Sequence, residues 1–169
     1  LGRQAWGQRL WLAVQETHKP MIVDADALYW LAQQPTQRDN WILTPHGGEA
    51  GRLLACDHQH VDNNRFESVQ QLVARYGGVV LLKGVGSLIA DKNCVNLCPY
   101  GNAGMATAGM GDTLAGIMAG LVAQFGLSLA TASQAVVVHA LAGDMAAEAG
   151  ERGLIATDLL PHLRVLLNG

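Results

Sequence analysis

Three short, mainly apolar runs, separated by segments of helical pattern, constrain the fold of this chain most strongly. Uninterrupted apolar runs of this length are typical of strands that are buried on both faces of a parallel sheet. The runs occupy residues 21–24, 41–44 and 79–82. Helical patterns lie before and between them, at residues 6–16, 26–31, 49–55 and 64–76. The alternation predicts an α/β fold in which helices on both faces flank a mostly parallel central sheet.

A hairpin is predicted at one edge of this sheet. Residues 87–90 and 94–97 read as two short strands, joined by the turn residues Asp91-Lys92-Asn93. No linker rich in Pro, Gly or Ser, no low-complexity tract and no internal repeat interrupts the chain. Its 169 residues, half of them hydrophobic, suffice for one sizeable core. We therefore predict a single domain over residues 1–169.

Charge and cysteine content narrow the class of protein. The 11 Lys and Arg residues face 14 Asp and Glu, and they form no basic stripe, which argues against a nucleic-acid partner. Cys56, Cys94 and Cys98 contain no CxxC pair, which argues against a disulfide framework or a structural zinc site. Cys94 and Cys98 are interpreted as small hydrophobic residues on one strand face. A reducing, cytoplasmic location is expected.

Two apolar stretches, 105–125 and 127–147, approach the length of a membrane span. Both contain an acid, Asp112 or Asp144, and a charge near the bilayer centre costs about 2.5–3.5 kcal/mol. They are predicted to be buried helices of a protein with no membrane partner. The GxxxG spacing of Gly116 and Gly120 is interpreted as a sign of close packing.

A glycine-rich loop that runs into the first of these helices is the best candidate for an active site. A helix starting near Gly111 places Asp112 in its first turn, where backbone N–H groups lack partners and attract a phosphate. Gly109 and Gly111 allow close approach of an anion. Asp112 is suited to accept a proton from a hydroxyl held beside that phosphate. The alternative is that Asp112 only stabilises the start of the helix.

Further polar residues follow the predicted strands, at the edge where ligands of such sheets bind. Asp24 and Asp26 follow the first strand, as magnesium ligands or as plain helix caps. His46 precedes a helix, as a capping residue or as a substrate contact beside flanking glycines. Lys83 ends the third strand and either reaches to water or contacts a phosphate. For each of these residues both alternatives stay open.

Several local motifs are absent or weak. The chain has neither a Walker A loop nor a complete GxGxxG fingerprint between a strand and a helix. His58 and His60 beside Asp57 lack further ligands at a usual metal spacing, and this segment is predicted to be a solvated polar loop. His139, within an apolar helix, is predicted to be a core histidine whose polar atoms are satisfied.

Four segments in order resemble one known family. They are VDADAL at 23–28, LTPHGGEAGRL at 43–53, LLKGVGSLIAD at 81–91 and GNAGMATAGMGDTLAGIMAGL at 101–121. Together they resemble the NAD(P)H-hydrate dehydratases, a branch of the ribokinase-like superfamily. The resemblance implies a ribokinase-like fold and a hydro-lyase that uses ADP to convert hydrated NADH or NADPH back to the normal cofactor. The ring hydroxyl of the S epimer is phosphorylated and phosphate is then lost, which leaves AMP and inorganic phosphate.

The resemblance also implies roles for individual residues. Asp112 matches the catalytic residue, which contacts the hydrate and accepts its hydroxyl proton, and Gly109, Met110 and Gly111 match the anion hole. His46 and Asn102 match further substrate-binding residues, His46 as a hydrate contact and Asn102 as a residue that helps to position the phosphates or Mg²⁺. The nucleotide-binding positions are Lys83, Gly84, Val85, Gly86, Ser87 and Gly111. Mg²⁺ is expected with the nucleotide, but no residue is assigned as its ligand.

The wider organisation is also an expectation from the resemblance. Family domains open with further strands and a Gly-Pro-Gly-Leu-Gly turn, of which only Leu1-Gly2 would remain, so the N-terminal part of the domain is expected to be missing. A homo-oligomer is expected, together with an NAD(P)H-hydrate epimerase that is fused to the protein or works with it. The alternatives are a ribokinase-like kinase for a vitamin precursor, such as a hydroxymethylpyrimidine or a thiazole alcohol, and a non-catalytic interaction domain.

Overall fold

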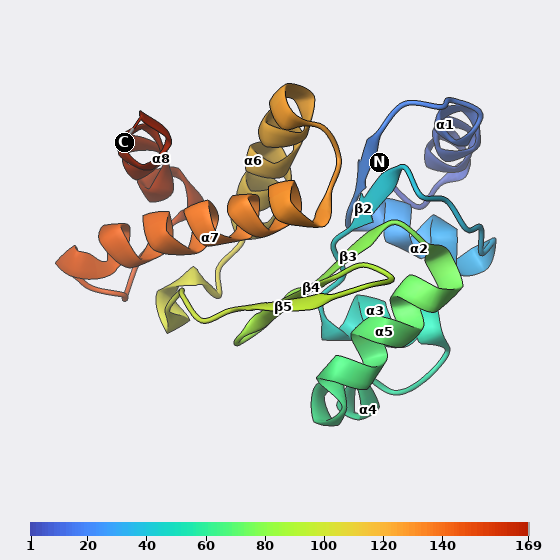
Figure 1. The fold of residues 1–169 in the computed structure, drawn as a ribbon, viewed down its shortest axis with the longest axis horizontal. Coiled ribbons are helices and arrows are strands. Elements are labelled where there is room, and N and C mark those ends of the chain that lie inside the picture. The colour runs from blue at the N-terminus through green and yellow to red at the C-terminus, as the bar shows by residue number, and fades with distance from the viewer. Residues whose placement is uncertain (169) are drawn as a thin grey trace. The chain divides into compact units, whose positions relative to one another are not determined.

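The computed structural model describes residues 1–168 and divides the chain into two compact units. The first unit is Leu1–Leu97, and the second begins at Cys98 (Figure 1). The boundary falls inside a strand, between Leu97 and Cys98. The single domain over the whole chain stays a prediction.

A five-stranded sheet forms the centre of the first unit. Its strands lie side by side in chain order: β1 (Met21–Val23), β2 (Trp41–Leu43), β3 (Val79–Leu82), β4 (Ser87–Ala90) and β5 (Val95–Cys98). β1 and β3 both pair with β2 in parallel, with Ile22 opposite Ile42 and Leu43 opposite Val80. β4 turns back antiparallel to β3. The predicted α/β class, the mostly parallel sheet and the edge hairpin are confirmed.

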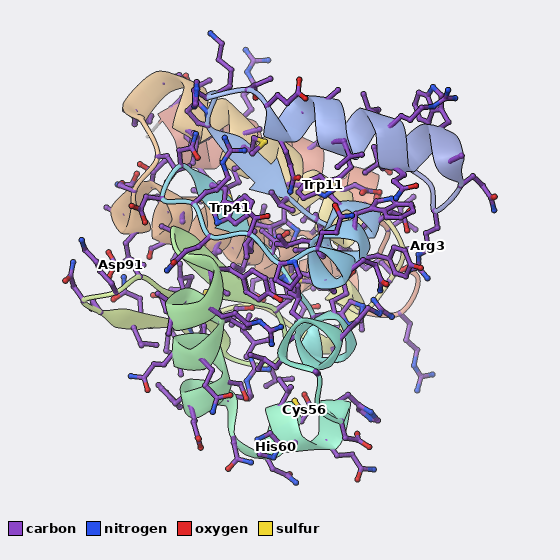
Figure 2. All side chains as sticks on the ribbon, turned by 90° about the vertical axis from the view of Figure 1, so that its right-hand side faces the viewer. Arg3, Trp11, Trp41, Cys56, His60 and Asp91 are labelled. Carbon is purple, nitrogen blue, oxygen red and sulfur yellow. The ribbon has the colours of Figure 1, made fainter. Side chains whose placement is uncertain are left out.

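Five helices of the first unit share one core with this sheet. They are α1 (Ala5–Gln15), α2 (Asp26–Gln33), α3 (Gly47–Leu54), α4 (His58–Asn63) and α5 (Arg65–Tyr76). Two right-handed crossovers that advance in the same direction along a sheet place their helices on the same face. Consistent with this rule, all five helices contribute buried side chains to one apolar cluster with β1 to β4. Trp11 and Trp41 are both buried in that cluster (Figure 2).

Two local predictions in this unit were wrong. The polar segment after α3 was expected to be a loop, but it contains α4, because Asp57 caps Gln59 N–H at 2.9 Å and Val61 is fully buried. His58 and His60 still project to solvent from this helix, as expected of a solvated segment. Cys94 is exposed in the turn before β5, so only Cys98 behaves as a small core residue.

The second unit is helical. It consists of η1 (Ala103–Met105), α6 (Met110–Phe125), α7 (Leu129–Ala146), η2 (Ala147–Ala149), η3 (Ala156–Leu159) and α8 (Leu160–Asn168), where η denotes a 3-10 helix. The Ser128 side chain caps α7 at Thr131 N–H. A small core gathers Met110, Ala142, Leu154 and Leu159. No helix within residues 1–168 is long and apolar enough to cross a membrane.

The prediction that Gly116 and Gly120 mediate close packing was also wrong. Both glycines are exposed on α6, and a Cβ built on either would meet no atom within 4 Å. The close approach occurs on α7 instead, where a Cβ on Gly143 would overlap the Met105 side chain. A larger residue at Gly143 would therefore displace the Met105 side chain, whereas the two glycines of α6 have open space around them.

Candidate active site

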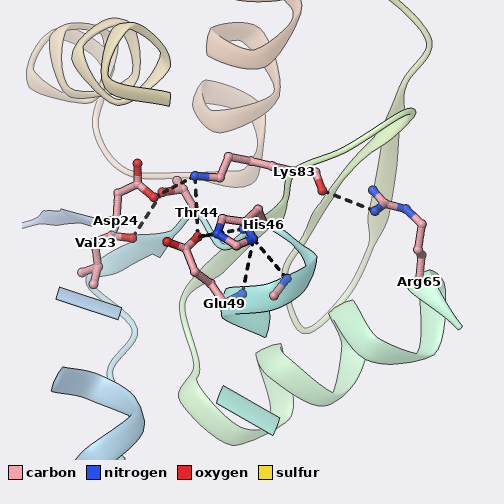
Figure 3. A network of polar contacts seen from close by, with 8 residues as sticks. Val23, Asp24, Thr44, His46, Glu49, Arg65 and Lys83 are labelled. Carbon is pink, nitrogen blue, oxygen red and sulfur yellow. Dashed lines mark hydrogen bonds and ion pairs between the residues drawn. The ribbon is translucent and has the colours of Figure 1, made fainter. Parts of the chain in front are cut away.

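The carboxyl ends of β1 and β3 are joined by an ion pair. Lys83 Nζ lies 2.8 Å from Asp24 Oδ1 and 3.8 Å from Glu49 Oε2 (Figure 3). Parallel strands place these ends at the same edge of the sheet, and the long lysine stem reaches across β2. The three side chains are only 11–20% exposed, so they interact largely away from water. The Lys83 ammonium is held by carboxylates of the protein and does not simply reach to water, whereas its contact with a phosphate stays a prediction.

His46 caps α3 and remains accessible. Its Nδ1 accepts hydrogen bonds from Gly48 N–H at 3.0 Å and from Glu49 N–H at 3.4 Å, while Glu49 Oε2 accepts from His46 N–H at 2.9 Å. This reciprocal capping box begins α3 at Gly47, two residues before the predicted start. Because Nδ1 acts as an acceptor, the neutral ring carries its proton on Nε2. Nε2 lies 3.5 Å from Glu49 Oε2, and the side chain is 61% exposed, so part of the ring remains accessible to a ligand.

The loop from Lys83 to Ser87 is an ordered turn with an exposed tip. Gly84 has φ 143° and Gly86 has φ 64°, which are backbone conformations that favour glycine. Val85 between them is fully exposed. The Ser87 hydroxyl donates to the Gly84 carbonyl at 3.1 Å, and Lys83 N–H donates to the Pro45 carbonyl at 2.8 Å. The loop therefore exposes backbone groups at its tip, and the contacts that order it do not involve the Val85 side chain.

In the second unit, Gly109 and Asp112 define the start of α6. Gly109 is the N-cap residue with φ 87°, and its C=O accepts from Thr113 N–H at 2.9 Å. The N–H groups of the first turn have no partner within the helix and carry the positive end of its dipole. Asp112 is exposed in this turn, and among residues 1–168 its carboxylate has no hydrogen-bond or ion-pair partner. A free acid thus lies beside a set of free donors.

Asn102 is held by an acid that the sequence did not single out as a site residue. Asp144 Oδ1 accepts from Asn102 Nδ2, and Asp144 Oδ2 accepts from Gly101 N–H, both at 3.0 Å. Asn102 Oδ1 in turn caps η1 at Gly104 N–H, also at 3.0 Å. Both ends of the Asn102 amide are therefore used to order the loop before α6. The only sequence clue to Asp144 was its position as an acid within an apolar helix.

His139 lies against the first turn of α6, as a buried histidine. Burial lowers its pKa to about 4, and the nearby Met110 backbone opposes this shift. Its Nε2 has no partner within the described chain. The ring is buried as the sequence predicted, but the expectation that its polar atoms are satisfied was wrong for Nε2. The ring lies next to the backbone of Met110, one of the anion-hole candidates.

The predicted site residues thus fall into two sets. His46 and the loop Lys83–Ser87 belong to the first unit, where they meet Asp24 and Glu49. Asn102 and Gly109–Asp112 belong to the second unit. There Asp144 contacts Asn102, and His139 lies next to the Met110 backbone. The supporting contacts of Glu49 and Asp144 were not predicted. Those of Arg65, which are described below, were not predicted either.

The two aspartates after β1 do not share a metal site. Asp24 is paired with Lys83, whereas Asp26 accepts from Arg3 Nε and Gly2 N–H, both at 2.9 Å. The hydrogen bond from Arg3, with that from Gly2, lowers the pKa of Asp26. Residues 1–168 contain no group of three His, Cys, Asp or Glu side chains that could hold a metal ion.

Comparison with known proteins identifies first the fold of this chain and then its family. The fold is ribokinase-like. The family model described as NAD(P)H-hydrate dehydratase matches residues 1–164. This chain belongs to that family, as its four motifs predicted, and the match favours the dehydratase over the vitamin-precursor kinase.

Three similar proteins illustrate the match. A bifunctional NAD(P)H-hydrate repair enzyme of Coxiella burnetii is 55% identical over 171 residues, which cover 99% of this chain and 35% of the relative. An ADP-dependent (S)-NAD(P)H-hydrate dehydratase of Neisseria meningitidis serogroup B is 36% identical and is covered to 60%, again with 99% of this chain. The solved ADP/ATP-dependent NAD(P)H-hydrate dehydratase of Bacillus subtilis, co-crystallised with ATP/Mg²⁺, gives a TM-score of 0.88 at 27% identity, over 99% of this chain and 61% of that one. The chain thus spans about a third of its bifunctional relatives.

Proposed function

We propose that this chain carries an ADP-dependent dehydratase activity on the S epimer of NAD(P)H hydrate. The ring hydroxyl of the hydrate attacks the terminal phosphorus of ADP, its proton leaves, and AMP is released. Loss of phosphate together with a ring proton then restores the dihydronicotinamide. The family match over residues 1–164 is the observation that carries this proposal. The names of the Neisseria and Bacillus proteins support the nucleotide dependence.

Asp112 is the catalytic residue in this proposal, and it accepts the hydroxyl proton. Its carboxylate is exposed and has no hydrogen-bond or ion-pair partner in residues 1–168, so its oxygens are accessible to accept a proton. The backbone donors of Gly109, Met110 and Gly111 form the anion hole, which stabilises charge on the transferring phosphoryl group. They are preorganised because the positive φ of Gly109 fixes the start of α6.

The remaining roles follow the motif positions. Lys83, Gly84, Val85, Gly86 and Ser87 bind the nucleotide, chiefly through backbone groups, since the Lys83 ammonium is already paired. Gly111 is a further nucleotide contact. His46 binds the hydrate through its exposed edge, and Asn102 contributes through the loop that its amide orders. Mg²⁺ accompanies the phosphates of the nucleotide, which it neutralises.

We further propose a cytoplasmic homo-oligomer that works with an NAD(P)H-hydrate epimerase. The bifunctional names of several relatives, including those of Coxiella burnetii and Vibrio cholerae, support a second activity within the same protein. Both NADH hydrate and NADPH hydrate are substrates in this proposal. The substrates are small molecules, and neither a nucleic acid nor a membrane is a partner.

The Asp112→Ala variant tests this proposal. We expect loss of hydrate repair by at least about 100-fold, the usual range for removal of a general base, with ADP binding retained. Glu151→Gln, at an exposed acid of the same unit, serves as the control and should leave repair unchanged. Repair is followed by the absorbance of the dihydronicotinamide, and ADP binding by calorimetry. Unchanged turnover in Asp112→Ala would exclude the proposed role.

A further inference from the structure

A single arginine joins both ends of the loop Lys83–Ser87. Arg65, the first residue of α5, donates from Nη2 to the Leu82 carbonyl at 3.1 Å and to the Gly86 carbonyl at 3.2 Å. Its Nη1 donates to the Lys83 carbonyl at 3.3 Å (Figure 3). Two of these carbonyls lie where the loop begins and one where it ends. The planar guanidinium is suited to such a contact because it presents several donors in a fixed geometry.

The position of Arg65 is electrostatically unfavourable for a positively charged side chain. The N-terminus of a helix carries partial positive charge, which repels a guanidinium in the first turn of α5. Burial also lowers the pKa of Arg65, although the nearby Asp62 raises it. The side chain is partly buried and bonds only to backbone oxygens among the described hydrogen bonds. These costs are offset by two hydrogen bonds to the loop Lys83–Ser87 and one to Leu82 at the end of β3.

The contacts of Arg65 also orient the opposite side of the loop. In a trans peptide the C=O and the following N–H point in opposite directions. Because the Lys83 and Gly86 carbonyls face Arg65, the N–H groups of Gly84 and Ser87 are directed away from it. A side chain at Gly84 is incompatible with this arrangement, since its Cβ would lie 2.7 Å from Arg65 Nη1. The loop therefore presents the Gly84 and Ser87 donors on the side away from Arg65.

We propose that Arg65 is a positioning residue for nucleotide binding, which fixes the donors of the loop Lys83–Ser87 toward an anionic nucleotide. The inference rests on the proposed function, because it takes this loop as the nucleotide-binding segment. Arg65 acts through the three carbonyls and does not itself contact the nucleotide. Preorganised donors bind an anion more tightly because the loop loses less conformational freedom on binding.

Calorimetric titration with ADP and Mg²⁺ tests this inference without requiring turnover. In Arg65→Gln, we expect the dissociation constant for ADP to rise about tenfold or more, as expected when charge-assisted hydrogen bonds are lost. The steady-state KM for ADP should rise with it, whereas the KM for the hydrate should change little. Arg75→Gln, at an exposed arginine of the same helix, is the matched control and should bind ADP as the unaltered protein does.

Arg65→Lys separates positioning from simple charge attraction and also guards against a variant that fails to fold. A lysine keeps the positive charge but cannot bond three carbonyls in one plane, so ADP binding should stay weakened. Full recovery of affinity in Arg65→Lys, or equal affinity in Arg65→Gln and Arg75→Gln, would overturn the inference. Absence of ADP binding in the unaltered protein would also overturn it. Failure of hydrate repair alone, with the Arg65 effect on ADP intact, would count against the proposed function only.

Discussion

Lys83 Nζ and Asp24 Oδ1 lie 2.8 Å apart, so the residue after β3 is ion-paired with the residue after β1. β2 lies between these strands, and Glu49 from α3 approaches the same ammonium at 3.8 Å. One lysine therefore balances two carboxylates at the edge of the sheet where the motifs converge. It also links the loop Lys83–Ser87 to the capping box of His46 through Glu49.

Removing the positive charge of Lys83 should destabilise the protein. Lys83→Met leaves Asp24 and Glu49 close together without a cation, in a largely buried setting. We expect a loss of about 2 kcal/mol in the free energy of unfolding, below the range for fully buried pairs because some exposure remains. Lys92→Met, in the exposed turn before β5, is the control. Equal urea midpoints for the two variants would show that the ion pair contributes nothing.

His139 should make stability depend on pH. Burial holds its folded pKa at about 4, below the ordinary histidine value of 6.5, so the unfolded state binds more protons between these values. Stability is therefore complete above pH 6.5 and falls as the pH drops toward 4, by on the order of 3 kcal/mol. His139→Gln should flatten this part of the profile, measured by urea unfolding at several pH values. The same slope in both proteins would contradict the assignment.

Gly109 and Gly116 should respond oppositely to alanine. Gly109 has φ 87°, and a Cβ there would lie 3.2 Å from the Ala156 Cβ, so Gly109→Ala should lose about 1–2 kcal/mol of stability. Gly116 is exposed within α6 with open space around it, so Gly116→Ala should gain about 0.5–1 kcal/mol. Thermal unfolding of both variants measures the difference. Two shifts of the same sign would contradict the geometry at the start of α6.

Asp144 should hold the loop before α6 through Asn102. Asp144→Asn replaces an acceptor of two hydrogen bonds by an amide, so we expect a loss of about 2 kcal/mol in unfolding free energy. Glu148→Gln, at an exposed acid just after α7, should change the stability by less than about 0.5 kcal/mol. Chemical denaturation compares the two. A loss in Asp144→Asn no larger than in the control would mean that these bonds are not stabilising.

The sequence predicted the parts of the molecule that depend on local pattern. The apolar runs gave β1 to β3, and the period of the following segments gave α2, α3 and α5, because burial on a sheet imposes those patterns. α4 was missed because a helix of six residues with one buried side chain has almost no periodic pattern. The start of α6 was predicted because glycine and an acid in a first turn have a direct physical meaning.

The supporting residues of the site could not be predicted in the same way. Arg65 contacts Gly86 across 21 positions, and Asp144 contacts Asn102 across 42. Lys83 and Asp24 are 59 positions apart. Such contacts arise only when the sheet order and the helix packing are fixed, and no local spacing encodes them. The sequence therefore left two alternatives open for individual residues. For His46, a capping residue or a substrate contact, both remain possible, because it caps α3 and its ring is still exposed.

The most direct test of the central claim is formation of NADH from its hydrate in the presence of ADP and Mg²⁺. The assay should be run on this chain and on a form extended at its N-terminus to the length of the Neisseria relative, of which the chain covers 60%. We predict ADP-dependent appearance of the dihydronicotinamide absorbance, with AMP and phosphate formed in equal amounts, in the extended form at least. Absence of turnover in both forms, while ADP still binds, would contradict the account and favour a kinase for a different hydroxyl-bearing substrate.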